Sequence, residues 1–370
     1  MARLRVAAVV ALLVCWLAPG LTGQRAAALP LLRYPNGLAL GADGSLYISD
    51  IGTHQILKLI GRTLTVVAGT GAGGFSGEGG PASRAALYAP HALAFDDEGR
   101  LLVADTYNHR VRRIDRQGLI TTIAGTGASA YSGDGGPATA AALNGPQDIA
   151  VDRTGQILVA DTYNATIRRI DAAGVITTFA GSEPGLGGDG GPATKALINM
   201  PSALAIAADG VVYISDAGNS RIRRVSADNT IETVVGTGGG SGLGGAGFAG
   251  DGGPAMQSKA FSAMGLRLNA AGDLYVSDSG NNRLRLVRNG AIATLAGAGR
   301  VGFSGDGGAA VAALLNTPQK IVVAPDGRVF IADRGNGRVR MIDTKGAIST
   351  VAGDGNPPGV FTVTEACCVR

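Results

Sequence analysis

Residues 90–125 read PHALAFDDEGRLLVADTYNHRVRRIDRQGLITTIAG, and four short apolar runs within this stretch decide the fold. The runs are Ala92–Phe95, Leu101–Ala104, Val111–Ile114 and Ile120–Ala124. Turn residues separate them, and their richness in Val, Ile and Thr favours strands over helices. The stretch therefore predicts one antiparallel sheet of four strands.

This unit occurs six times, and successive copies start 55 to 62 residues apart. Repeats of this length that contain four strands are typical of β-propellers. Sheets arranged radially bury both faces of each blade, and closing the ring leaves only short edges. We therefore predict an all-β fold, a six-bladed β-propeller of four-stranded antiparallel blades that fills residues 35–353. The blades start near Pro35, Pro90, Pro146, Pro201, Ala263 and Pro318.

Glycine-rich linkers join the blades, and the first reads AGTGAGGFSGEGGPA over Ala68–Ala82. Gly69, Gly71 and Gly74 match the spacing of a dinucleotide cradle, which a protein needs once, between a strand and a long helix. Related linkers stand at five blade junctions, each followed by only a short Ala/Leu helical turn, so we interpret them as scaffold. Each linker carries an acid that we expect to cap a turn, with calcium binding as the alternative. These acids are Glu78, Asp134, Asp189, Asp251 and Asp306.

The unit resembles the NHL repeat, especially the long-linker version of secreted bacterial proteins and the teneurin propeller. The resemblance rests on the linker motif SGDGGPA and on four matching segments, and it covers nearly the whole mature chain. It implies a propeller fold but leaves function open, because such propellers serve as binding platforms, RNA readers, lactonases or lyases. The segments are LLVADTYNHRVRRID (101–115), ILVADTYNATIRRID (157–171), VYISDAGNSRIRRVS (212–226) and LYVSDSGNNRLRLVR (274–288).

The two ends of the chain bear on its compartment. Basic Arg3 and Arg5 precede an apolar run and small residues, so residues 1–23 are predicted to be a secretory signal. Residues 24–34 form a lead-in and residues 354–370 a tail. We expect a secreted, extracellular or periplasmic protein, monomeric, with no stable membrane span. Removing the signal takes two arginines and leaves 30 Lys+Arg against 28 Asp+Glu. This near balance argues against a nucleic-acid partner.

Several repeated polar residues are expected to be structural. An Asp ends the second strand of each blade, an Asn follows three residues later in five blades, and Arg110, Arg221, Arg283 and Arg338 follow two residues after the Asn. We expect Asp or Asn to cap the turn and these Arg to pair with a neighbouring acid. Function is then sought where the repeat is broken.

The departures lie on the face that we expect to carry the linkers and the turns between second and third strands, called the top face. His54 and His109 occupy equivalent turns, and three histidines with His91 would suit zinc, although solvated turn histidines are the expected reading. Tyr107 and Tyr163 stand in neighbouring turns, where an aromatic ring with a polar tip suits a peptide or sugar. The predicted ligand-binding residues are Asn36, His91, Gln147, Asp148, Arg267, Gln319, Lys320, Tyr107, Tyr163 and His109.

Asn36, His91, Gln147 and Gln319 are expected to ring the mouth of the central channel. Charges at Asp148, Arg267 and Lys320 interrupt small residues nearer the axis, which predicts either a mutual ion pair or a polar ligand. We find no catalytic nucleophile–base–acid set, so we predict a binding scaffold for a protein or carbohydrate ligand, with no cofactor. The alternative is a metal-dependent lactonase or lyase that holds calcium or zinc over the channel.

Overall fold

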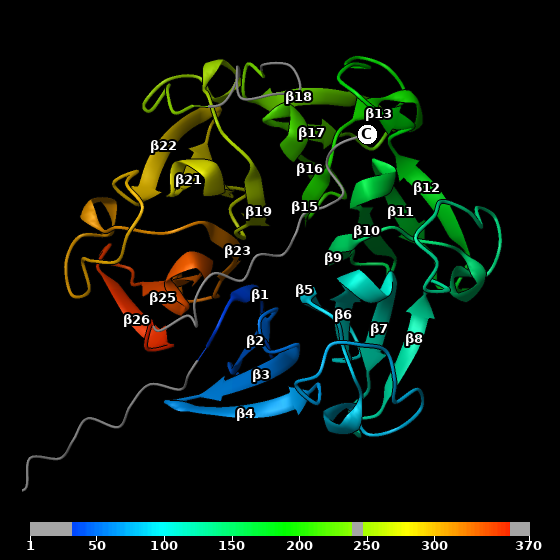
Figure 1. Ribbon diagram of the computed structural model, residues 1–370. Coiled ribbons are helices and arrows are strands. Elements are labelled where there is room, and N and C mark those ends of the chain that lie inside the picture. Colours follow the sequence, from blue (N-terminus) through cyan, green and yellow to red (C-terminus); the bar gives the residue numbers. More distant parts are fainter. Residues whose placement is uncertain (1–31, 239–246, 356–370) are drawn as a thin grey trace, which may run out of the picture.

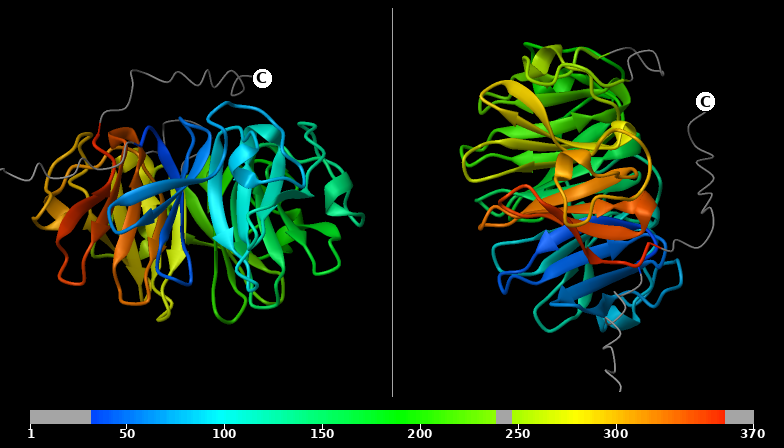
Figure 2. Two further views of the ribbon diagram at one scale, coloured as in Figure 1. Left: turned by 90° about the horizontal axis from the view of Figure 1, so that it is seen from below. Right: turned by 90° about the vertical axis from the view of Figure 1, so that its left-hand side faces the viewer.

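The structure is a computed structural model that describes residues 32–238 and 247–355. Six four-stranded antiparallel sheets stand around a central axis, as Figure 1 shows, so the predicted six-bladed β-propeller is confirmed. Viewed edge-on in Figure 2, the sheets form one thick disc. The predicted signal (1–23), most of the lead-in and nearly all of the tail lie outside the described residues.

The strands of each blade run in chain order from the axis to the rim. Blade one holds β1 (Pro35–Leu40), β2 (Leu46–Asp50), β3 (Gln55–Ile60) and β4 (Thr63–Ala68). Blade two holds β5 (Pro90–Phe95), β6 (Leu101–Asp105), β7 (Arg110–Ile114) and β8 (Ile120–Ala124). Blade three holds β9 (Pro146–Val151), β10 (Ile157–Asp161), β11 (Thr166–Ile170) and β12 (Ile176–Ala180).

The other three blades repeat this order. Blade four holds β15 (Pro201–Ile206), β16 (Val212–Asp216), β17 (Arg221–Val225) and β18 (Ile231–Val235). Blade five holds β19 (Ala263–Leu268), β20 (Leu274–Asp278), β21 (Arg283–Arg288) and β22 (Ala291–Ala296). Blade six holds β23 (Pro318–Val323), β24 (Val329–Asp333), β25 (Arg338–Ile342) and β26 (Ile348–Ala352). The strand β23 packs against β1, so blade six meets blade one and closes the ring.

The core lies between neighbouring blades. All five residues of β6 are buried, because a blade is covered on both faces and its second strand has no solvent side. One apolar cluster joins Leu102 and Val111 of blade two to Ile149 and Val159 of blade three. Burial of such side chains contributes roughly 25 cal/mol for each Å² of apolar surface. The blades are therefore held together by their faces.

The linkers start and end beside the turns between second and third strands, as predicted for the top face, and their middle parts run along the outer edge of the propeller. The amide of Gly79 donates to the carbonyl of Ile120 (2.8 Å), and the amide of Ile120 donates to Gly80 (2.9 Å). Each linker thus reaches the outermost strand of the next blade. The predicted short helical turns are single 3-10 turns: η1 (Ala82–Arg84), η3 (Ala138–Ala140), η5 (Ala193–Lys195), η7 (Ala255–Gln257) and η9 (Ala310–Ala312).

Close backbone contacts explain two of the linker glycines. Gly69 has φ +96°, and a Cβ there would lie 2.3 Å from the carbonyl oxygen of His54. Gly133 has φ +90°, and its Cβ would lie 2.6 Å from the Cα of Ala141. Only glycine meets both demands without strain. These glycines therefore serve the chain's own packing, which supports the interpretation of the motif as scaffold.

Two smaller features complete the description. The linker after blade three adds a parallel pair, β13 (Glu183–Pro184) with β14 (Leu197–Ile198). The glycine-rich linker segment Gly236–Pro254 lies partly outside the described residues, which omit 239–246. Among the residues that are described, no helix has the length and apolar character needed to cross a membrane.

Candidate functional site

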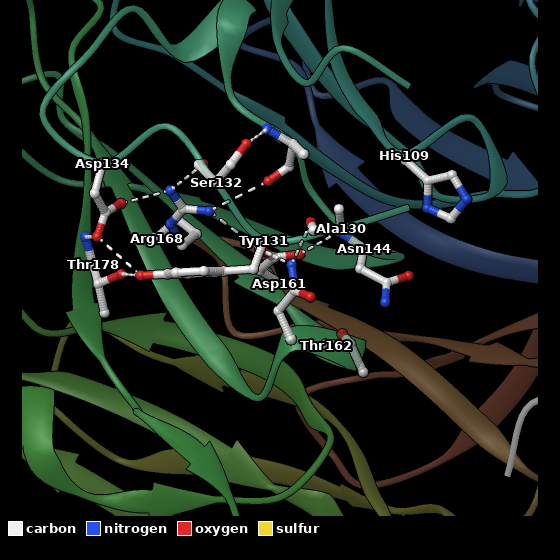
Figure 3. A network of polar contacts seen from close by, with 12 residues as sticks. His109, Ala130, Tyr131, Ser132, Asp134, Asn144, Asp161, Thr162, Arg168 and Thr178 are labelled. Carbon is white, nitrogen blue, oxygen red and sulfur yellow. Dashed lines mark hydrogen bonds and ion pairs between the residues drawn. The ribbon is translucent and has the colours of Figure 1, made fainter. Parts of the chain in front are cut away.

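A buried ion-pair network ties each linker to the next blade, and Figure 3 shows the one between blades two and three. Asp161 and Arg168 are both fully buried. The Arg168 guanidinium donates to Asp161 (3.4 Å), to Asp134 of the linker (2.5 Å) and to the carbonyl of Ser132 (3.1 Å). Tyr131 lies over the guanidinium at 4.7 Å. One arginine therefore joins a strand end to the linker wrapped around it.

Asp161 is the hub of this network. It accepts hydrogen bonds from the amide of Asn144 (2.6 Å) and the side chain of Asn164 (2.8 Å). Burial raises the pKa of Asp161 to about 6, although these hydrogen bonds and Arg168 favour the charged carboxylate. Asp161 makes no side-chain hydrogen bond that caps the turn after it, and Asn164 donates to Asp161 and to the carbonyl of Ala130, so the expectation that either residue caps this turn is wrong.

The network recurs in five blades, and its central arginine is not one of those predicted, although the predicted Arg221 also lies 3.9 Å from Asp189. The pairing arginine stands two residues further along the third strand. Arg110, which was expected to pair with an acid, stacks on Phe75 at 3.8 Å and donates to the carbonyl of Thr126 (2.5 Å). The five sets are Asp105–Arg112–Glu78, Asp161–Arg168–Asp134, Asp216–Arg223–Asp189, Asp278–Arg285–Asp251 and Asp333–Arg340–Asp306.

The linker acids therefore bridge blades, and the expectation that they cap turns is wrong. Asp134 accepts the amide of Thr178 (3.1 Å) on β12 as well as Arg168. Within residues 32–238 and 247–355, no three or more His, Cys, Asp or Glu gather in a group fit for a metal ion. In blade one, Leu57 takes the place of the arginine and shares an apolar cluster with fully buried Leu32.

The turn histidines join neighbouring blades, so the expectation of solvated side chains is wrong. The amide of Ala89 donates to Nδ1 of His54 (3.1 Å), and the amide of Gly145 donates to Nδ1 of His109 (3.1 Å). Desolvation lowers the pKa of both imidazoles. Asn282 makes the equivalent contact in blade five, where its Oδ1 accepts a hydrogen bond from the amide of Thr317 (2.9 Å).

The predicted ring at the channel mouth is present but buried. Asn36, Gln147 and Gln319 are at most 7% exposed, and His91 is 9% exposed. The Asn36 amide donates to the carbonyl of His91 (3.0 Å), and Gln319 donates to the carbonyl of Thr317 (3.3 Å). His91 bonds through Nδ1 to the carbonyl of Ala89 (2.9 Å), and desolvation lowers its pKa to about 3. Asn36, His91 and Gln319 therefore bond to backbone carbonyls and are largely shielded from solvent.

Two of the predicted charges meet inside the channel. Lys320 of blade six and Asp148 of blade three form an ion pair at 3.0 Å, which confirms the predicted mutual bridge. Asp148 also accepts the amide of Leu204 (2.8 Å), and Lys320 donates to the carbonyl of Ser202 (2.5 Å). The pair joins three blades and blocks the channel at this depth. Arg267 is half-buried nearby and is considered separately below.

The predicted tyrosines belong to an aromatic group on the top face. Tyr107 packs edge-to-face on Tyr88 (5.3 Å), and Tyr88 packs in the same way on His54 (5.3 Å). Tyr163 covers Gly145, where a Cβ would lie 2.3 Å from its ring. Since the amide of Gly145 also binds His109, the two turns are contiguous. We call Tyr88, Tyr107, His109 and Tyr163 the aromatic surface.

Tyr88 was not predicted, although it is 42% exposed and the most open member of the aromatic surface. It stands two residues before Pro90, at the end of a linker. Its amide donates to Asp105 (2.7 Å), which fixes the backbone at the head of blade two. Asn108, which follows Tyr107 in its turn, donates to the same Asp105. Hydrogen bonds to one buried carboxylate therefore hold the backbone at both tyrosines.

Comparisons with known proteins agree with this architecture. The family model described as the teneurin NHL domain matches residues 126–186, 185–226 and 301–357, and that of the NHL repeat matches residues 87–114. The chain belongs to the NHL-repeat β-propellers. Teneurin-3 of Danio rerio is 30% identical over 350 residues, which cover 84% of this chain but 12% of the teneurin. The chain thus spans about an eighth of the length of that relative.

Solved structures share the fold at low sequence identity. An auxiliary nutrient binding protein of Bacteroides thetaiotaomicron has a TM-score of 0.61 at 15% identity, covering 86% of this chain and 69% of the other. Virginiamycin B lyase of Staphylococcus aureus has a TM-score of 0.51 at 13% identity, covering 88% and 86%. Binding proteins and enzymes thus share this architecture, and the likeness identifies the fold alone.

Proposed function

We propose that this chain is a secreted binding scaffold that holds a protein or glycan ligand on its aromatic surface. The observation that carries the proposal is an asymmetry among otherwise equivalent turns. Blades two and three have Tyr107 and Tyr163 at the second position of the turn after their second strand, whereas the other blades have glycine there. These glycines are Gly52, Gly218, Gly280 and Gly335.

The fold itself does not require the two tyrosines, because the turns of four blades form with glycine. A large aromatic ring on a polar face offers contact area at low entropic cost, and such residues often dominate binding energy. Tyr107 and Tyr163 are half-buried, so each is packed on one side and open on the other. A rigid mount of this kind lowers the cost of ordering on binding.

Secretion is supported by the sequence of residues 1–23, with its basic start and apolar run. The near-equal numbers of acidic and basic residues in the mature chain favour a protein or carbohydrate ligand over a nucleic acid. We propose that the chain acts as a monomer, because the six blades complete one closed ring.

The alternative, a metal-dependent lactonase or lyase, would use the channel mouth. Asn36, His91, Gln147 and Asp148 lie there, but all four are buried, and Asn36 and Asp148 make hydrogen bonds to neighbouring blades. A binding scaffold therefore fits this geometry better than a metal-dependent enzyme does. Calcium or zinc in the purified mature protein, measured by elemental mass spectrometry after dialysis, tests the alternative: about one ion per chain would favour the enzyme.

The experiment for the binding reading is a screen of the purified mature chain against a glycan array and a panel of extracellular protein domains. We expect a saturable ligand whose binding is lost when Tyr88 is changed to Ala. Tyr88→Ala alters an exposed ring, so its thermal unfolding should stay close to that of the wild type. A ligand that binds Tyr88→Ala and the wild type equally would show that binding occurs elsewhere.

A further inference from the structure

The central channel holds more positive than negative charge. Asp148, Lys320 and Arg267 line the same small cavity. The carboxylate of Asp148 is already paired with Lys320 at 3.0 Å and accepts the amide of Leu204. One carboxylate therefore faces two cations. Because it is paired with Lys320, it balances the charge of Arg267 only weakly.

Arg267 is an addition to the repeat. The equivalent position on the first strand is Ala39, Ala94, Ala150 and Ala205 in the first four blades, and Val322 in the sixth. The side chain of Arg267 is half-buried, and its buried Nε has no hydrogen-bond partner among the described residues. The fold does not need an arginine at this place, and a partly desolvated guanidinium without a full set of acceptors is costly.

The cavity beside these charges is small, and more of its surface is polar than apolar. Its volume is about 10 Å³, which corresponds to about one water-sized particle. Apart from the three charged residues, its lining is aliphatic, including Leu38, Leu93 and Ile149. In such surroundings a nearby charge acts more strongly than in water, because the local dielectric constant is low. A single small anion there would be held by the two cations, which would take the place of its hydration shell.

We propose that a small monovalent anion of the halide class binds in this cavity against Arg267 and Lys320. The anion would balance the second cation, as Asp148 balances the first. Because Arg267 is only half-buried, its exposed side leaves a way in from solvent. The site is distinct from the aromatic surface, since it lies on the axis between the first strands of the blades.

A competing account is that Lys320 gives up its proton, so that Asp148 serves Arg267 alone. Burial lowers the pKa of Lys320, while the ion pair with Asp148 raises it. The donation from Lys320 to the carbonyl of Ser202, together with its pairing to Asp148, uses two of the three protons of a charged ammonium. The geometry therefore fits the charged form, and the two accounts differ in whether an anion is present.

The test uses bromide, which scatters anomalously, as the probe. Crystals of the full chain are soaked in sodium bromide, and anomalous difference density is calculated for the wild type and for Arg267→Ala. In parallel, thermal unfolding is followed in bromide and in gluconate at equal ionic strength. Arg267→Ala restores the alanine of four other blades and should fold. The control is Arg153→Ala, which removes an exposed charge from the turn between β9 and β10.

We expect an anomalous peak within contact distance of the Arg267 guanidinium in the wild type and Arg153→Ala, and none in Arg267→Ala. At bromide about ten times its dissociation constant, binding favours the folded state about 11-fold. That stabilisation by bromide should disappear in Arg267→Ala only. Absence of the peak in the wild type, or equal bromide stabilisation in all three proteins, would overturn the proposal and support an uncharged Lys320.

Discussion

Replacement of Arg168 by leucine tests whether the buried ion-pair network holds the linkers in place. The change removes the cation that joins fully buried Asp161 to Asp134 of the linker. Leucine is the residue that blade one carries at the equivalent position, Leu57, so the side chain suits the surroundings. Blade one also has a buried acid, Asp50, but it accepts four backbone amides, whereas Asp161 accepts only one and depends on the arginine.

The cost of the change follows from that unpaired acid. Removing one partner of a buried ion pair typically destabilises a protein by about 3–5 kcal/mol, because the other charge is left desolvated. In a domain of this size, each kcal/mol lowers Tm by roughly 2 °C, so Arg168→Leu should unfold about 6–10 °C earlier. Limited proteolysis should cut the linker between blades two and three first, because Asp134 of this linker no longer has Arg168 as its ion-pair partner.

The matched control is Arg169→Leu, the next residue on the same strand, which is half-buried and alternates to the other face of the blade. Its Tm should change by less than about 2 °C, in keeping with a surface substitution. Calorimetry of the two variants and the wild type at pH 7 gives the comparison. Equal Tm values for Arg168→Leu and Arg169→Leu would refute the role given to the network.

The same variant has a predicted pH dependence. Burial raises the folded pKa of Asp161 to about 6, above its ordinary value of 3.8. Its contribution to stability is therefore fully present below about pH 4 and is lost as the pH rises through 6. Without Arg168 the folded pKa rises further, so a neutral Asp161 at pH 4 needs no cation. The destabilisation by Arg168→Leu should be smaller at pH 4 than at pH 7.

Other predictions concern single side chains. His91 has a folded pKa of about 3, below 6.5, so its stabilising effect is present above pH 6.5 and is lost as the pH falls. His91→Gln, with the residue of blades three and six, should keep about 1 kcal/mol that the wild type loses between pH 6.5 and 5.5, measured by urea unfolding. The hydrogen bond from the amide of Gly145 to His109 is tested in the same assay. His109→Ala should lower the free energy of unfolding by about 1 kcal/mol, whereas His109→Asn should retain it, because an Asn can accept the same bond as Asn282 does.

The fold was predictable because its determinants are local and repeated. A unit such as 90–125 contains alternating apolar runs and turns, and six copies leave few ways to bury both faces of a sheet. The path of the middle parts of the linkers was not predictable in this way. It depends on contacts such as Gly79 with Ile120, which join residues of different repeats and leave no periodic pattern.

The candidate site was predicted in part. Tyr107 and Tyr163 were found because they interrupt a repeat, and the pair Asp148–Lys320 because charges replace small residues. The pairing arginine was misplaced, because Arg110 and Arg112 have the same parity on one strand and both stack on Phe75, and only the ion pairs of Arg112 with Asp105 and Glu78 distinguish them. Tyr88 was missed, because the linkers were interpreted as scaffold, although Asn144, Asn199 and Asn316 occupy the equivalent position in three other copies and Tyr88 departs from them.

The central claim, that Tyr107 and Tyr163 form the binding surface, is tested most directly by replacing both with glycine, the residue of the other four blades. Titration of the ligand found in the screen should show a loss of affinity of about 30-fold, which corresponds to about 2 kcal/mol for removing anchor residues. The control Gln117→Gly, at an exposed turn of the opposite face, should bind as the wild type does. Unchanged affinity of the double variant, with its Tm preserved, would contradict the claim.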